Sequence, residues 1–197
     1  MTILLSNGIG MGLVLRGELF TGAYSSGGEF GHMIHRPHGA LCRCGRHGCI
    51  EAYAGNYAIL RASEGYSDQS EPDADVDQET MLRLAGDARR QDGPARDAFT
   101  RAGEALGYGL GSLFALIDPA PVAVVGPGTL AFDIIEPAIR KAIAQTAGGQ
   151  HDAVISFDLQ TDEMPLILEG CARKALEAVD TELFAPGYIN AMQAAAG

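Results

Sequence analysis

The amino-acid sequence predicts an α/β domain, and three observations support this fold class. Residues 122–125 are rich in β-branched side chains and predict a buried strand. A Gly-Pro-Gly turn and then a helical pattern follow, which is the order of elements in an α/β unit. Apolar residues also recur at steps of three and four over 94–117, which predicts a long amphipathic helix with proline in its first turn.

The first third of the chain is predicted to hold short strands and a long loop. Residues 2–6 are β-prone, and glycines at alternate positions then lead into a predicted hairpin formed by 13–15 and 18–20. Residues 24–48 are mostly Gly, Ser, Pro, His and Arg, which suits neither helix nor strand. A loop of this length inside a compact domain is usually functional or held by a metal.

The remainder of the chain is predicted to be mainly helical. Helices are expected over 49–62, 81–90, 94–117, 131–144 and 164–179, and a second buried strand over 153–159. Residues 65–78 are acidic and polar and predict a surface loop or a disordered crossover, and residues 183–197 show no pattern. Gly103, Gly107 and Gly111 share one face of the long helix and should let another backbone approach closely, whereas Cys171 is expected in the core.

Size and charge limit the possible functions. The chain has 197 residues, of which 47% are hydrophobic, so we expect a single domain over 1–197 with a packed core. Its net charge of −11 disfavours direct contact with nucleic acid or with anionic membranes. No apolar run approaches the roughly 18 residues needed to span a bilayer, and the N-terminus lacks a signal-peptide pattern. We therefore expect a cytoplasmic protein.

Three cysteines lie within eight residues, at Cys42, Cys44 and Cys49. Cys42 and Cys44 are too close for an easy disulfide, and clustered cysteines without an export signal indicate metal ligands. Zinc takes four ligands in a tetrahedron, so a fourth must come from elsewhere. The candidates on sequence distance are the histidines His32, His35, His38 and His47. The ligands of a structural zinc site usually come from two separated segments, which favours a histidine upstream of the cysteines over His47. The alternative is three reduced thiols that are merely buried.

The segment from Gly8 to Glu51 resembles the ROK family of bacterial sugar kinases and sugar-responsive transcriptional repressors. The matching motifs are Gly-Ile-Gly-Met-Gly at 8–12, Glu-Phe-Gly-His-Met at 29–33, and Cys-Arg-Cys-Gly through Gly-Cys-Ile-Glu at 42–51. The likeness continues less sharply through 118–128. It implies an actin-like ATPase or ribonuclease H-like lobe, with a mixed sheet flanked by helices and a zinc-binding loop.

The resemblance also implies roles for individual residues. It makes His32 the fourth ligand of a structural zinc ion, beside the three clustered cysteines, and it assigns sugar contacts to Glu29, His32 and Glu51 within a zinc and sugar loop at 22–51. Carboxylates accept hydrogen bonds from vicinal hydroxyls, and an imidazole fixed through one nitrogen offers the other as a defined donor. If the parent protein is a kinase, the nucleotide-binding residues would be Gly8, Gly10, Gly126 and Gly128.

We expect this chain not to be a competent kinase by itself. The family's kinases need an Asp-x-Gly-x-Thr phosphate loop and an aspartate base, and neither motif precedes the glycine-rich strand here. Pro127 also lacks the N–H that a phosphate-binding turn would use. The sequence therefore predicts the C-terminal effector-binding and oligomerisation half of a ROK-type regulator, a homodimer or tetramer that binds DNA through a separate N-terminal domain. The alternatives are a fragment of a hexose or N-acetylhexosamine kinase, and a dimerisation module without a ligand.

Overall fold

The computed structural model describes residues 1–72 and 75–183. These residues belong to two compact units, Met1–Thr161 and Asp162–Gly197, and each unit is considered by itself. The single domain expected over 1–197 remains a prediction. The acidic loop expected over 65–78 is described except at 73–74, and most of the patternless tail lies outside the described residues.

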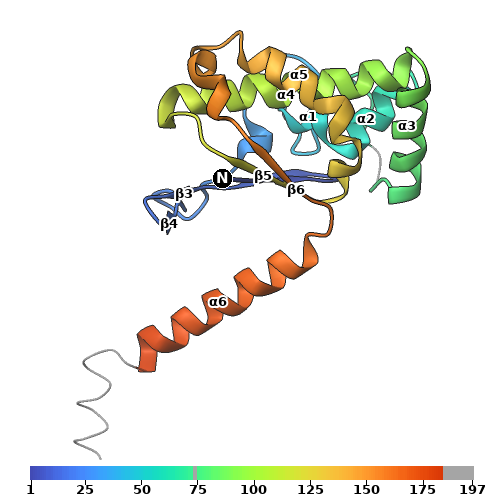
Figure 1. Cartoon of the computed structure of the whole chain (residues 1–197). Coiled ribbons are helices and arrows are strands. Elements are labelled where there is room, and N and C mark those ends of the chain that lie inside the picture. Colours follow the sequence, from blue (N-terminus) through green and yellow to red (C-terminus); the bar gives the residue numbers. More distant parts are fainter. Residues whose placement is uncertain (73–74, 184–197) are drawn as a thin grey trace, which may run out of the picture. The chain divides into compact units, whose positions relative to one another are not determined.

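A mixed four-stranded sheet forms the floor of the first unit (Figure 1). Its strands, in spatial order, are β2 (Ile9–Gly12), β1 (Thr2–Leu5), β5 (Val122–Val125) and β6 (Phe157–Gln160). Strand β1 pairs antiparallel with β2 and parallel with β5, and β5 pairs parallel with β6. A separate hairpin joins β3 (Val14–Leu15) to β4 (Glu18–Leu19). Its turn uses positive φ at both Arg16 and Gly17, which matches the twist of the strands.

Helices cover one face of this sheet (Figure 1). The α-helices of the first unit are α1 (Glu51–Ala54), α2 (Asn56–Ser63), α3 (Gln78–Arg90), α4 (Pro94–Ile117) and α5 (Phe132–Ile143). The 3-10 helices are η1 (Phe30–His32), η2 (Pro127–Ala131) and η3 (Ala147–Val154). Ile3 and Leu5 are buried, whereas Thr2 is exposed and Leu4 half-buried, as strand alternation requires. The predicted mixed sheet flanked by helices is confirmed.

Several predicted boundaries differ from the structure for local reasons. The single helix expected over 49–62 breaks at Gly55, where the chain is extended and a Cβ would lie 2.8 Å from the Asn7 carbonyl oxygen. Helix α3 begins earlier than expected because the Asp77 carboxylate accepts the Thr80 N–H at 2.7 Å and caps it. Strand β2 is absent from the prediction because glycine at alternate positions weakens the strand signal. Strand β6 is shorter than expected because η3 occupies 147–154.

The predicted close approach of another backbone is found at two of the three glycines of α4, which pack against α5, whereas a Cβ on Gly111 would meet the Thr146 side chain. A Cβ on Gly103 would lie 2.6 Å from the Ile135 carbonyl oxygen, and one on Gly107 would lie 2.5 Å from the Ile139 carbonyl oxygen. These separations are too short for any side chain, so the two helices meet backbone to backbone.

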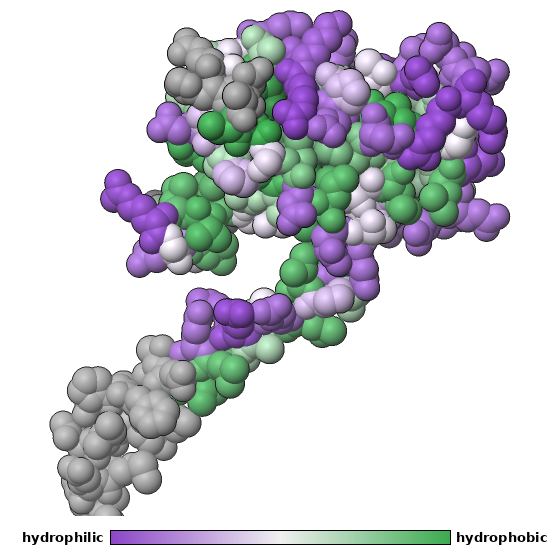
Figure 2. Space-filling view, viewed as in Figure 1, coloured by the Kyte–Doolittle hydropathy of each residue, from purple (hydrophilic) through white to green (hydrophobic). Residues whose placement is uncertain are grey.

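The second unit contains α6 (Met164–Leu183). Both apolar and polar side chains lie on its surface (Figure 2). Its exposed large apolar residues are Met164, Leu166, Ile167, Leu168, Leu176 and Val179. The prediction that Cys171 belongs to the core is wrong, because this thiol is exposed and the described part of the unit offers no second layer to bury it. None of the described helices is both long and apolar enough to cross a membrane.

The packing of α4 on α5 leads to a stability prediction. We expect Gly107→Ala to lower the free energy of unfolding by about 1–3 kcal/mol, because the added methyl group would push the helices apart. The matched control is Gly86→Ala in α3, where the nearest atom to a Cβ is the end of the Arg90 side chain at 3.7 Å. This control should be neutral or stabilising by up to about 1 kcal/mol, from helix propensity. Urea unfolding of both variants tests the prediction, and equal stability of the two would contradict it.

Candidate metal centre and its surroundings

Four potential metal ligands, three within the long loop and one directly after it, lie close together. The ligand atoms of His32, Cys42, Cys44 and Cys49 all lie within 4.8 Å of one another. The Cys44 and Cys49 sulfurs are 3.7 Å apart, and the Cys42 sulfur lies 3.8 Å from His32 Nδ1. The sequence leaves four histidines as candidates for the fourth ligand. Among the described residues, His32 is the one that belongs to this cluster.

The geometry of this cluster fits a tetrahedral metal ion. All three cysteines are free thiols, and a sulfur separation of 3.7 Å is far longer than the ~2.05 Å of a disulfide. With metal–sulfur bonds of about 2.3 Å, a tetrahedral zinc site places its sulfurs about 3.8 Å apart. Three thiolates and one imidazole are a common donor set for structural zinc. These residues could therefore hold a zinc ion with little rearrangement.

Left-handed glycines fold the cysteine loop into this position. Gly45 and Gly48 have φ of 80° and 85°, which favours glycine. At Gly48 a Cβ would also overlap the Arg36 carbonyl. The Cys42 N–H donates to the Arg46 carbonyl at 2.9 Å, which closes the turn that carries Cys44. The loop thus presents its sulfurs on one side.

The thiols differ in how readily they ionise. Burial, together with the neighbouring Cys42, raises the pKa of Cys49 to about 12, and burial also raises the pKa of Cys42. Burial opposes ionisation of Cys44 too, but the backbone at Arg46 and the adjacent thiols hold its pKa below the usual value. Since a thiol binds metal as thiolate, Cys42 and Cys49 must each lose a proton before they act as ligands.

The His32 imidazole connects the cluster to an exposed carboxylate. One turn of η1 brings Glu29 and His32 to the same side, with Glu29 Oε2 3.8 Å from His32 Nε2. The Glu29 side chain is 69% exposed and that of His32 is 28% exposed. Phe30 is buried in the core, and Gly31 lies so close to the Ile9 carbonyl that no side chain would fit. Buried contacts at Phe30 and Gly31 therefore hold the η1 turn, while Glu29 and His32 remain partly exposed.

Glu51 occupies a more enclosed position at the start of α1. It is only 7% exposed, and its Oε2 accepts the Ile9 N–H at 3.0 Å. The Cys42 thiol donates to its other oxygen at 3.7 Å. The carboxylate thereby links strand β2 to the metal centre. It also limits the room beside Gly8, where a Cβ would lie 3.1 Å from Oε2.

Three of the four candidate nucleotide-binding glycines lie beside β1, whereas Gly8 follows that strand and lies beside Glu51. Gly10 pairs with Leu4, and both Gly126 and Gly128 pack against Leu5. The Gly126 N–H donates to the Gln160 carbonyl at 2.8 Å, so it is already engaged in the sheet. The turn between β5 and η2 therefore presents fewer N–H groups than a glycine-only turn.

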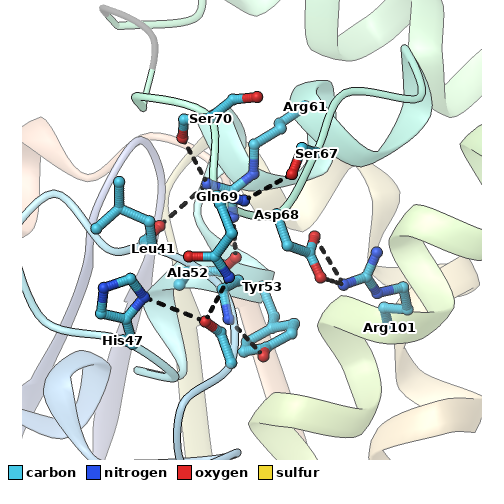
Figure 3. A network of polar contacts seen from close by, with 12 residues as sticks. Leu41, His47, Ala52, Tyr53, Arg61, Ser67, Asp68, Gln69, Ser70 and Arg101 are labelled. Atoms are coloured by element: carbon cyan, nitrogen blue, oxygen red, sulfur yellow. Dashed lines mark hydrogen bonds and ion pairs between the residues drawn. The ribbon is translucent and has the colours of Figure 1, made fainter.

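A polar network that the sequence analysis misses braces the cysteine loop (Figure 3). The acidic segment expected to be a plain surface loop lies against it, with the Leu41 N–H donating to the Asp68 carbonyl at 2.8 Å and Gln69 Nε2 donating to the Gly39 carbonyl at 3.1 Å. Arg101 in α4 binds both carboxylate oxygens of Asp68. The one available signal is an arginine on the buried side of α2, Arg61, where the pattern predicts an apolar residue.

Comparison with protein-family models gives a match over residues 1–161 to the model described as the ROK family. The chain belongs to the ROK family. Among curated proteins, it is 32% identical over 157 residues to an N-acetylmannosamine kinase of Escherichia coli O157:H7, a match that covers 80% of this chain and 49% of the kinase. It is 29% identical over 141 residues to an N-acetylglucosamine repressor of the same organism, covering 69% of this chain and 34% of the repressor. The chain thus spans about half, or less, of the length of these relatives.

Solved ROK structures share the fold. A ROK family glucokinase from Streptomyces griseus, in complex with glucose and AMPPNP, superposes with a TM-score of 0.61 at 26% identity, covering 82% of this chain and 55% of that one. A ROK family transcriptional regulator, a homologue of the E. coli MLC protein, gives a TM-score of 0.63 at 24% identity. This match covers 81% of this chain and 40% of the regulator. Kinases and regulators are therefore both similar to this ROK chain.

The buried position of Glu51 leads to a second prediction. We expect Glu51→Ala to lower the free energy of unfolding by about 1–3 kcal/mol, because the Ile9 N–H would lose its acceptor in a buried position. Glu51→Gln is the matched control, since its amide oxygen can still accept that hydrogen bond, and it should be clearly less destabilised. Denaturant unfolding of the three proteins tests this difference, and two equally stable variants would show that the hydrogen bond is unimportant.

Proposed function

We propose that this chain is the sugar-sensing domain of a ROK-type transcriptional regulator. In this proposal His32, Cys42, Cys44 and Cys49 hold a structural zinc ion, and Glu29, His32 and Glu51 contact a sugar or sugar derivative. The observation that carries the proposal is the arrangement at His32, whose imidazole faces a cysteine sulfur through Nδ1 and the exposed Glu29 carboxylate through Nε2.

The chemistry of these side chains suits a hydroxylated ligand. A carboxylate accepts hydrogen bonds from neighbouring hydroxyls, and an imidazole with one nitrogen bound to metal keeps its proton on the other. Glu29 is the most exposed member and is expected to make the main direct contacts, whereas Glu51 approaches from within the domain. The names of the relatives refer to N-acetylmannosamine, N-acetylglucosamine and glucose. These names support a hexose or an N-acetylhexosamine as the class of ligand.

Zinc would have a structural role in this proposal. When bound, it supplies the positive charge that keeps three thiols ionised and ties the cysteine loop to η1. His32 then has one orientation, with Nε2 directed toward Glu29. The protein residues do the recognition, and no bond in the sugar is made or broken.

The alternative is a fragment of a ROK-type sugar kinase. The turn at 126–128 favours the sensor, since the Gly126 N–H is bonded to Gln160 and Pro127 has no N–H to offer a phosphate. We further propose that the protein is cytoplasmic, forms a homodimer or tetramer, and contacts DNA through a separate domain. Sugar binding without ATP binding supports the sensor, and ATP binding by the chain would favour the kinase.

The zinc proposal is tested by removing one ligand. We expect the purified chain to contain one zinc ion and Cys44→Ser to lose it, because a hydroxyl is a much poorer ligand than a thiolate. The matched control is Cys171→Ser, which removes the exposed thiol of α6 and should keep its zinc. Elemental analysis with thiol titration measures both. A zinc-free parent chain with all of its thiols reactive would overturn the proposal.

The sugar proposal is tested at Glu29. We expect Glu29→Gln to weaken sugar binding by roughly 10- to 100-fold, the effect of losing hydrogen bonds to a charged acceptor, with zinc content unchanged. Glu79→Gln removes an exposed carboxylate from α3 and should bind as the parent does. Calorimetry with hexoses, N-acetylhexosamines and pentoses supplies the affinities. An affinity of Glu29→Gln equal to that of the parent would remove Glu29 from the site.

A further inference from the structure

Arg61 is a buried arginine that joins three segments of the first unit (Figure 3). It lies in α2 and is 3% exposed. Its Nη1 donates to the Leu41 carbonyl at 3.0 Å and to the Ser70 carbonyl at 3.4 Å, and its Nη2 donates to the Ala52 carbonyl at 2.9 Å. Backbone oxygens from three separate stretches of chain therefore meet at one guanidinium group.

The acceptors of Arg61 are next to the residues of the candidate site. Leu41 directly precedes Cys42, and Ala52 directly follows Glu51. The spacing between the cysteine loop and the start of α1 is therefore set by a rigid, planar group with fixed donor directions. Arg61 also lies over the ring of Tyr57, at 5.8 Å from its centroid, and the Tyr57 hydroxyl donates to the Cys42 sulfur at 3.7 Å.

Among the described residues, no Asp or Glu oxygen lies within salt-bridge distance of the Arg61 guanidinium. A buried cation with only neutral acceptors is costly. A zinc ion with three thiolates and a neutral imidazole carries a formal charge of −1. The charge of Arg61, which binds the carbonyl of the residue before Cys42, is opposite in sign to that formal charge.

We propose that Arg61 is a positioning residue for the metal centre, which fixes the distance between the Cys42 and Glu51 segments through its hydrogen bonds to the Leu41 and Ala52 carbonyls. This inference rests on the proposed zinc site but not on the proposed sugar. It gives the metal centre a support from outside its own loop, through a side chain that never contacts the ion.

The test compares Arg61→Met and Arg61→Lys in the full chain. Methionine keeps the apolar stem but removes both the charge and the donors, whereas lysine keeps the charge without the planar fork. We expect zinc affinity, measured by competition with a chelator, to fall 10- to 100-fold in Arg61→Met and less in Arg61→Lys. The visible absorption of the Co²⁺-substituted variants should also change, because it reports the ligand geometry.

Two control variants separate positioning from general destabilisation. Arg89→Met removes an arginine of α3 that binds the Asp133 carboxylate and the Leu130 carbonyl, neither of which belongs to the cysteine loop, and should keep zinc affinity within about twofold of the parent on the same scale of outer-shell effects. Ile139→Val weakens the packing of α5 on α4 and provides a protein of lowered melting temperature with its metal centre intact.

Each outcome supports or overturns the inference. Unchanged zinc affinity and an unchanged Co²⁺ spectrum in Arg61→Met overturn it, as does an equal loss of affinity in the controls. If Arg61→Met fails to fold, zinc affinity and the Co²⁺ spectrum of Arg61→Lys are used instead. Values equal to those of the parent in both measurements overturn the inference. A parent chain that binds no zinc overturns both this inference and the zinc proposal. A parent that binds zinc but no sugar refutes the sensor alone and leaves the role of Arg61 to be judged from zinc affinity.

Discussion

The approach of four ligand atoms, from two segments of chain, is the constraint on which the rest of the site depends. The cysteine loop and the η1 turn have little secondary structure of their own, and each is held by close contacts at glycine and by backbone hydrogen bonds. Cys42 and Cys49 are buried with raised pKa values, so these two thiols are poorly ionised without a cation. The buried core of the first unit, which includes Phe30, Cys42 and Cys49, provides the base on which both segments lie.

The polar side chains around the cluster differ in exposure, which increases from Glu51 through His32 to Glu29. Glu51 is enclosed and bonded to β2, His32 is partly exposed, and Glu29 faces outward. A ligand that binds at the exposed end would therefore contact a chain of polar groups reaching into the sheet. The ROK relatives of this chain include both kinases and regulators, so the scaffold is common to the two classes.

Much of the fold follows from the sequence because its signals are local. The long helix α4 and the buried strand β5 match their predicted bounds, since apolar periodicity and β-branched runs describe them directly. The cysteine spacing likewise predicts a cluster, and the family motif selects His32. The break at Gly55 escapes prediction because it depends on contact with Asn7, which is distant in sequence, and strand β2 escapes it because alternate glycines weaken the strand signal. The hydrogen bonds of Arg61 cannot be predicted from the sequence either, because their acceptors are backbone oxygens, which every residue carries.

The close meeting of α4 and α5 has a mechanical consequence. Where backbones touch at Gly103 and Gly107 there is no side chain between them that could change rotamer and let one helix slide along the other. The pair must move as one rigid body. The connection of α4 to the cysteine loop is of another kind, because it runs through the Arg101 side chain to Asp68, whose carbonyl accepts the Leu41 N–H.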